Sequence, residues 1–194
     1  MDQKITKNFS FYEFAPSGAG KNWLPDSQYQ QMMITLLARN LQIIREQMPP
    51  YSFITITSAV RDAKDYDRLK KNGYNPSETS DHNFGNAVQL KPGTDKYKKF
   101  GPTYNFTVGA ADCVPTGITA KELFNIAMQL IKNNKCFFGQ VIYEYNPVKK
   151  VDWVHFGGYY AYFFSDPIVQ FLGKPLFRKS TDNGKTYQGI DNPL

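Results

Sequence analysis

The change of hydrophobic period between residues 33 and 58 is the feature that most limits how this chain can fold. The sequence "MPP" ends a helical pattern, and "FITITS" (Phe53–Ser58) then alternates apolar and polar residues as a β-strand does. Asp26 or Ser27 is in position to cap the helix. The chain is therefore expected to pack a helix against a sheet. The helical pattern consists of Met33, Leu36, Leu37, Leu41, Ile44 and Met48.

Shorter patterns continue towards the C-terminus. "DAKDYDRLKKNGY" predicts a polar helix that Gly73 ends, and "TAKE" (Thr119–Glu122) is a capping box that opens an apolar helix. Lys91–Thr103 is expected as a loop, "DPIVQFLG" as a last short helix, and Asp182-Asn183-Gly184 as a hairpin. Further strands are expected from Ala87 to Leu90, over Tyr104–Val114, and in "CFFGQVIYEY" and "DWVHFGG", the last two joined by a turn at Asn146–Lys150.

This order predicts a single α+β domain over residues 1–194, with N-terminal helices packed on a mostly antiparallel sheet. The length is sufficient for one core. No apolar run is long enough to cross a bilayer, so no membrane span is expected. The first residues, "MDQKITKNFSFYEF", lack the apolar segment of a secretory signal, so export is expected to use another route, such as cell lysis or packaging into a particle.

The net charge of +6 fits either nucleic acid or an anionic cell wall. No arginine-rich helix or nucleic-acid motif supports the first partner, so no nucleic-acid binding is expected. Cys113 and Cys136 lie in apolar stretches and are expected as reduced, buried thiols, with a disulfide as the alternative. Cysteine-bound zinc is not expected, because there is no C-x-x-C motif.

Two histidines, His82 and His155, each stand at the end of a strand near turn glycines. A catalytic zinc ion takes three protein ligands, and two histidines with one carboxylate form a usual set. Asp112 in "VGAADC" suits the third place, because an acid in an apolar strand is costly unless it is paired or binds a metal. The alternative is an aspartate at a strand end that caps a loop.

Two more side chains suit a hydrolytic zinc site. Asp152 lies three residues before His155 and shares its face only where the strand bends, for which the turn at Pro147 and Lys149-Lys150 offers a place. Arg61 follows the strand Phe53–Ser58 and could grip a carboxylate or an oxyanion with its planar fork, although alone it is a surface arginine.

The segments "TSAVR", "SDHNFG", "GAAD" and "DWVHF" occur in this order and resemble the zinc D-alanyl-D-alanine carboxypeptidase and L-alanyl-D-glutamate endopeptidase family. Its members cut peptidoglycan and are related in fold to the lysostaphin and hedgehog domains. "NFSFYEF" followed by a loop, a long helix and "IREQM" is similar to the start of phage-type and bacterial members. The resemblance covers residues 8–172 and leaves 173–194 as a polar tail.

One departure from the family pattern concerns the acidic ligand. The family has an aspartate seven residues after its first histidine, where this chain has Gln89. "VGAAD" repeats the family's strand further on, which indicates an insertion from about Asn86 to Val108 that returns with Asp112 at the ligand position. A dead site is the alternative. A second, mild departure is Ala59 in place of glycine.

The resemblance implies a Zn²⁺ ion on His82, Asp112 and His155, with Asp152 as general base and Arg61 as the clamp for substrate or oxyanion. Ser80 is expected to contact the substrate or to support a ligand. The implied function is a zinc-dependent peptidase that hydrolyses peptidoglycan stem peptides, encoded by a phage. It would be made in the bacterial cytoplasm and act at the cell wall, carried in the virion beside other virion proteins or released on lysis.

The competing hypothesis is an inactive virion or cell-wall-binding protein on the same fold. Asp112 would then be structural, and the aromatic run Tyr159–Phe164 would contact a subunit or a saccharide, unless it packs in the core. Catalysis requires His82, Asp112 and His155 to converge within metal-ligand distance, whereas binding does not. A nucleic-acid binder is supported only by the net charge and some Lys/Tyr clusters, and would need steep salt dependence of DNA binding.

Overall fold

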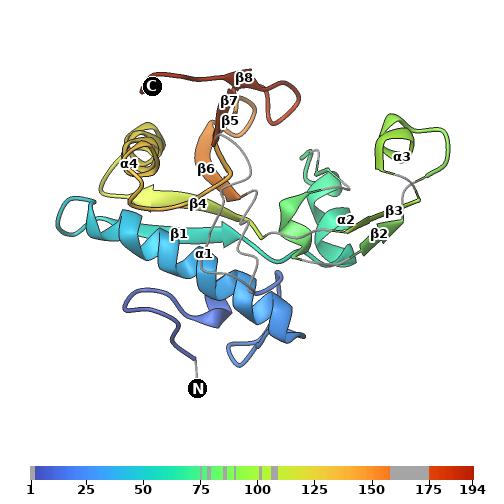
Figure 1. The fold of residues 1–194 in the computed structure, drawn as a ribbon, viewed down its shortest axis with the longest axis horizontal. Coiled ribbons are helices and arrows are strands. Elements are labelled where there is room, and N and C mark those ends of the chain that lie inside the picture. The colour runs from blue at the N-terminus through green and yellow to red at the C-terminus, as the bar shows by residue number, and fades with distance from the viewer. Residues whose placement is uncertain are drawn as a thin grey trace.

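A six-stranded mixed sheet organises the molecule (Figure 1). The computed structural model describes residues 3–74, 76–77, 80–84, 87–89, 91–100, 102–105, 109–157 and 175–194. The strand order is β1-β4-β6-β5-β7-β8, and every neighbouring pair is antiparallel except β5 and β7. The strands are β1 (Phe53–Ser58), β4 (Ala111–Thr116), β5 (Gln140–Asn146), β6 (Val151–Gly157), β7 (Leu176–Ser180) and β8 (Gln188–Gly189). The expected mostly antiparallel sheet is confirmed.

The helices form where the sequence supplies caps. α1 (Gln28–Glu46) begins at Ser27, whose side chain accepts a hydrogen bond from the Gln30 amide. α4 (Ala120–Lys132) begins at the Thr119–Glu122 capping box. α2 (Ala63–Lys71) ends close to Gly73, which has a φ of 78°. A short 3₁₀ helix, η1 (Phe11–Phe14), precedes α1.

One hydrophobic core joins α1, α4 and one face of the sheet. Alternate strand residues turn towards it, because successive side chains of a strand point to opposite faces. Cys113, Tyr143 and Val154 are such residues, and they occupy paired positions on β4, β5 and β6. Helices and strands alternate along the chain, with α4 between β4 and β5, so the helices that pack on the sheet are not all N-terminal as expected.

A second sheet pairs β2 (Ala87–Gln89) with β3 (Thr103–Asn105). α3 (Asp95–Phe100) lies between these strands in a segment expected as a loop, and the single strand expected over Tyr104–Val114 is divided between β3 and β4. Figure 1 shows this small hairpin and α3 standing away from the main sheet, beyond α2. The last helix expected from "DPIVQFLG" lies outside the described residues, as does the aromatic run at 159–164.

Several smaller expectations are confirmed. β5 and β6 pair around the turn at Asn146–Lys150, and β7 and β8 pair around a turn with positive φ at Asn183 and Gly184. Cys113 and Cys136 are both free and buried. Within the part of the chain that the structure describes, none of the helices combines the length and apolar character that a membrane crossing requires.

Candidate metal centre

Asp112 and His155 face each other directly across two strands of the main sheet. β4 and β6 pair with Asp112 opposite His155, on the face that the helical core leaves open. The Asp112 Oδ1 and His155 Nδ1 atoms lie 2.9 Å apart. Strand pairing therefore fixes both side chains on a rigid base.

His82 approaches from a separate turn. The short 3₁₀ helix η2 (Asp81–Asn83) carries it, and Ser80 caps this helix by accepting a hydrogen bond from the His82 amide. Phe84 then ends the helix in the left-handed conformation with a φ of 45°. The His82 carbonyl accepts a hydrogen bond from the Arg61 amide, which ties the turn to the segment after β1.

Gly109 explains how this turn packs against the start of β4. A Cβ atom at Gly109 would lie 2.2 Å from a ring carbon of Phe84, a distance that real side chains do not reach. The buried Phe84 ring can therefore lie flat against the backbone only because residue 109 is glycine. The glycine of "VGAAD" thus joins the histidine turn to the strand that supplies Asp112.

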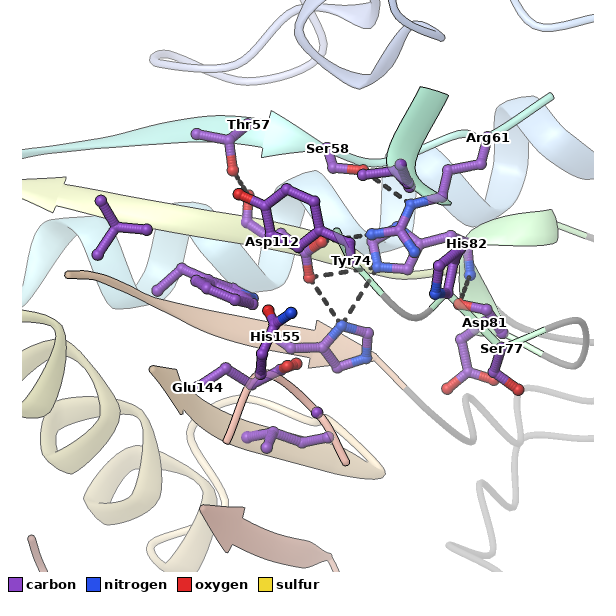
Figure 2. A pocket seen from close by; sticks show the side chains of 18 of the residues that line it. Thr57, Ser58, Arg61, Tyr74, Ser77, Asp81, His82, Asp112, Glu144 and His155 are labelled. Carbon is purple, nitrogen blue, oxygen red and sulfur yellow. Dashed lines mark hydrogen bonds and ion pairs between the residues drawn. The ribbon is translucent and has the colours of Figure 1, made fainter. Parts of the chain in front are cut away.

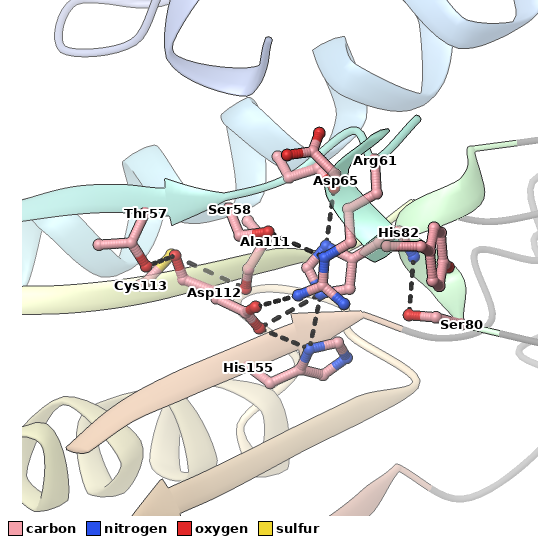
Figure 3. A network of polar contacts seen from close by, with 12 residues as sticks. Thr57, Ser58, Arg61, Asp65, Ser80, His82, Ala111, Asp112, Cys113 and His155 are labelled. Atoms are coloured by element: carbon pink, nitrogen blue, oxygen red, sulfur yellow. Dashed lines mark hydrogen bonds and ion pairs between the residues drawn. The ribbon is translucent and has the colours of Figure 1, made fainter. Parts of the chain in front are cut away.

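The three side chains converge on one point (Figures 2 and 3). The His82 Nε2 atom lies 3.2 Å from Asp112 Oδ1 and 3.2 Å from His155 Nδ1. Two ligands placed about 2.0 to 2.1 Å from a tetrahedrally coordinated zinc ion lie about 3.3 Å apart, so these separations suit a metal. The group His82, Asp112 and His155 could therefore hold a metal ion.

The hydrogen bond of His82 to the backbone supports this interpretation. Its Nδ1 atom lies 2.7 Å from the Ala59 carbonyl oxygen, and a carbonyl oxygen only accepts. Nδ1 must then carry a proton, which leaves the lone pair of the neutral ring on Nε2, facing Asp112 and His155. Metal-binding histidines are typically oriented in this way by an acceptor behind the ring.

The charges around the site favour a neutral His82 and an ionised Asp112. Burial, and after it the Arg61 guanidinium, lower the pKa of His82 to about 4. Burial alone would raise the pKa of Asp112, but His82 and Arg61 outweigh it and hold this pKa well below its usual range. For His155 burial lowers the pKa, but the hydrogen bond to Asp112 and the charges of Asp112, Glu144 and Asp81 together outweigh it, so that the pKa is raised.

Arg61 holds the other oxygen of Asp112. Its Nη2 atom donates to Asp112 Oδ2 over 2.5 Å, and its Nε atom donates to the Ser58 hydroxyl over 2.9 Å (Figure 3). The predicted arginine is thus in the site, but it contacts a proposed ligand directly. Asp112 is oriented from both sides, with Oδ1 on the histidines and Oδ2 on Arg61.

Glu144 is a site residue that the sequence analysis missed. It lies on β5 opposite Trp153, on the same face as His155, and Figure 2 shows it beside the histidine. Burial, and after it the nearby Asp112 charge, raise the pKa of Glu144 to about 7. The signal was available, because "VIYEY" places an acid in an apolar strand just as "GAADC" does.

Asp152 does not join this group. β6 pairs with β5 residue by residue without a bulge, so the expected bend is absent and Asp152 faces away from His155. Its carboxylate accepts a hydrogen bond from the Tyr143 hydroxyl over 3.1 Å. Tyr143 belongs to the core, where the Lys121 ammonium of α4 lies 5.8 Å from its ring centroid. Regular strand geometry therefore separates Asp152 from the histidines.

Gln89 lies apart from the site as well. It ends β2 of the small hairpin, whereas Asp112 lies on β4 of the main sheet. The chain between His82 and Asp112 leaves the site, pairs with itself and returns, as the predicted insertion requires. Asp112, and not Gln89, therefore lies beside the two histidines.

The site opens into a cavity of about 1010 Å³. One wall contains Tyr74 and Trp153, whose rings meet edge to face at 6.3 Å between centroids. The C-terminal segment contributes Arg178 and Tyr187 to the lining. Asn183 connects this segment to the chain beside Tyr74, because its side chain donates to the Gly73 carbonyl oxygen over 2.9 Å. A cavity of this size accommodates a peptide or another small ligand.

Tyr187 reaches from the C-terminal segment towards Glu144. A Cβ atom at Gly184 would lie 3.0 Å from the Tyr187 hydroxyl and 3.4 Å from Glu144 Oε2, so both groups border the same small space. Burial raises the pKa of Tyr187, and the charges of Glu144 and Asp112 raise it further. The phenol is therefore a neutral hydrogen-bond donor beside the carboxyl group.

Comparisons of the chain with known proteins found no relative. No family model matches the chain, no curated protein matches it, and no solved structure matches it. The residues of the site and the motifs they carry are therefore the features that bear on function.

Proposed function

We propose that this protein is a zinc-dependent peptidase that hydrolyses peptidoglycan stem peptides. The observation that supports the proposal best is the convergence of His82, Asp112 and His155 beside a fourth titratable group, Glu144, in one large cavity. Two histidines and one carboxylate leave a coordination position for a reacting group, as catalytic zinc sites do. The motif resemblance supports the substrate class.

Zinc on these three residues would supply a Lewis acid that polarises the scissile carbonyl and lowers the pKa of the attacking water. Glu144 suits the general base, because it shares the face of His155 and its pKa of about 7 lies near neutral pH. It would accept a proton from the attacking water and deliver it to the leaving amine nitrogen. We therefore assign to Glu144 the role that the sequence pattern suggested for Asp152.

The main role of Arg61 would be to hold the carboxylate of Asp112. Its Nη2 atom is engaged by Asp112 Oδ2 and its Nε atom by Ser58, so the guanidinium keeps the carboxylate ionised and oriented. Among the described residues Nη1 makes no hydrogen bond, which leaves one donor edge for a substrate oxygen or a developing oxyanion. Ser80 would support the site through the turn that carries His82.

The setting of the reaction also belongs to the proposal. The motif resemblance supports a phage-encoded enzyme that acts during lysis or from the virion. A net charge of +6 would favour approach to an anionic cell wall. Other virion proteins would be its partners in the second case.

The direct test measures hydrolysis of purified peptidoglycan by the zinc-loaded chain and two matched variants. Glu144→Gln should bind zinc normally and lose about 100- to 10,000-fold in rate, as expected when a general base is removed. Asp152→Asn removes an acid from the other face of the sheet and should change the rate by no more than a few-fold. New peptide termini, detected by mass spectrometry, would identify the bond.

The outcomes separate the competing functions. No zinc binding after zinc is supplied, or no hydrolysis by a zinc-loaded wild type, would overturn the peptidase proposal in favour of a non-catalytic binding protein on this fold. A large loss in Asp152→Asn with normal activity in Glu144→Gln would return the general-base role to Asp152.

A further inference from the structure

Arg178 is an arginine in the cavity that the proposed chemistry does not use. It lies on β7, paired with Ile142 of β5, and Ile142 in turn pairs with His155 of β6. Paired residues share a face of the sheet, so Arg178 points to the same side as His155. Its neighbour Phe177 confirms this direction, because it meets Phe124 of α4 in the core on the other side.

Arg178 also has no acidic partner. The two other arginines that line the cavity are paired, Arg61 with Asp112 and Arg68 with Asp65. Among the described residues no carboxylate lies within ion-pairing distance of Arg178, and its side chain makes no hydrogen bond. A partly buried guanidinium without a partner is costly, which makes it a natural place for an anion supplied by the ligand.

The position of Arg178 fixes where that anion lies. Neighbouring strands are about 4.8 Å apart, so the Cα atoms of Arg178 and His155 are separated by about 10 Å across two strand spacings. An extended peptide covers about 3.3 to 3.6 Å per residue, so 10 Å corresponds to about three residues. An arginine side chain is long and flexible, so it can cover part of this distance. Tyr187, which the Arg178 charge also influences, adds a neutral donor nearby.

We propose that Arg178 binds a carboxylate of the substrate, located one to two residues from the bond that is cut. The inference rests on the proposed peptidase function and adds the group that positions the peptide along the cavity. A planar guanidinium matches a carboxylate with two parallel hydrogen bonds, which gives orientation as well as affinity. Arg178 is thus a specificity-determining residue on the C-terminal segment.

The test measures peptide binding without turnover. The zinc-loaded Glu144→Gln chain is titrated calorimetrically with the stem peptide L-Ala-γ-D-Glu-L-Lys-D-Ala-D-Ala. The same peptide is then used with the D-Glu α-carboxylate, the terminal carboxylate, or both converted to carboxamides. One of these conversions should weaken binding about 10- to 100-fold, the loss expected for one charge-assisted pair. Adding Arg178→Gln should make the acid and amide forms bind alike, and Arg178→Lys should restore part of the difference.

Lys179→Gln in the same background is the matched control, because Lys179 is the next residue of β7 and points to the opposite face. It should leave the preference for the carboxylate intact. The inference is overturned if Arg178→Gln keeps the preference, if no conversion matters, or if none of the peptides binds. Hydrolysis by the chain with Glu144 intact is measured separately. If the chain cleaves the peptide but shows no preference for the carboxylate, only the role of Arg178 is wrong. If it prefers the carboxylate but does not cleave the peptide, only the peptidase proposal is wrong.

Discussion

The two faces of the main sheet use the same strands for opposite purposes. On β4 and β6, Cys113 and Val154 pack into the helical core, while their neighbours Asp112 and His155 face the cavity and carry the candidate metal site. The same alternation separates Glu144, on the cavity face, from Asp152, which borders the cavity but whose carboxylate bonds to Tyr143 on the other face. Which acid lies near the histidines therefore depends on the face of the sheet that its side chain occupies, more than on its distance from them in sequence.

The largest effects on zinc affinity and stability are expected from two separate substitutions in β6, one on each face of the sheet. His155→Gln should reduce zinc affinity by more than about 100-fold, the upper end of the loss seen when only an outer partner of a ligand is removed. Val154→Ala should keep the zinc and lower the free energy of unfolding by about 2 kcal/mol through the cavity it leaves. Zinc titration of both variants measures the affinity, and urea denaturation measures the free energy of unfolding. Normal zinc content in His155→Gln would contradict the site.

Glu144, on the cavity face, should make the stability of the protein depend on pH. Its pKa is about 7 in the folded, metal-free chain against an ordinary value of 4.5, so the folded state keeps the proton up to a higher pH. Below pH 4.5 both states are protonated. As pH rises to about 7 the unfolded state loses the proton first, and stability falls by up to about 3 kcal/mol. Glu144→Gln should remove this loss and be more stabilised, relative to wild type, at pH 8 than at pH 4.

Urea denaturation in the presence of a chelator at the two pH values tests this prediction. Asp152→Asn, on the other face, serves as the control and should not reproduce the pH-dependent gain. An equal difference between Glu144→Gln and wild type at pH 4 and pH 8 would show that the Glu144 carboxyl is not held in its neutral form.

Gly109→Ala tests whether the cavity face depends on the packing of the histidine turn. The new methyl group would meet the Phe84 ring at 2.2 Å, so the turn with His82 must shift. Overpacking of this kind costs about 1 to 3 kcal/mol, and zinc affinity should fall with it. Gly189→Ala is the control, because a Cβ atom there meets nothing within 4 Å. Unchanged zinc affinity and stability in Gly109→Ala would mean that the turn and β4 are not coupled.

The smallest effect is expected on the core side. Tyr143→Phe removes the hydroxyl that donates to Asp152 and should cost about 0.5 to 1.5 kcal/mol of stability. Zinc affinity should stay unchanged, because the pair lies on the face opposite the metal ligands. A marked loss of zinc in this variant would contradict the separation of the two faces.

Much of the fold followed from local signals in the sequence. The caps at Ser27 and Thr119, and the alternation of Phe53–Ser58, lie within a few residues of the features they determine. The ligand set was predictable for a similar reason, because a lone acid in an apolar strand requires a partner. Glu144 carried the same signal and was overlooked in favour of a family spacing.

The rest of the site depends on pairings that no local pattern specifies. The register that sets Asp112 opposite His155, and Arg178 in line with Ile142, joins strands far apart in the chain. The bond between Arg61 and Asp112 depends on the same register and on the bulge between Ile56 and Ser58. Lys91–Thr103 was expected as a loop because lysine, glycine and proline dominate it, yet α3 forms within it.

The hairpin of β2 and β3 has a consequence for how such sites diversify. The entropy lost on closing a loop grows only with the logarithm of its length, so a long excursion costs little more than a short one. Here the excursion also closes on itself through strand pairing. The number of residues between two ligands can then vary at little cost in stability, provided that the strand carrying the second ligand pairs in the same register. A search that fixes the spacing between ligands would miss such proteins, whereas one that follows the ligand-bearing strands would find them.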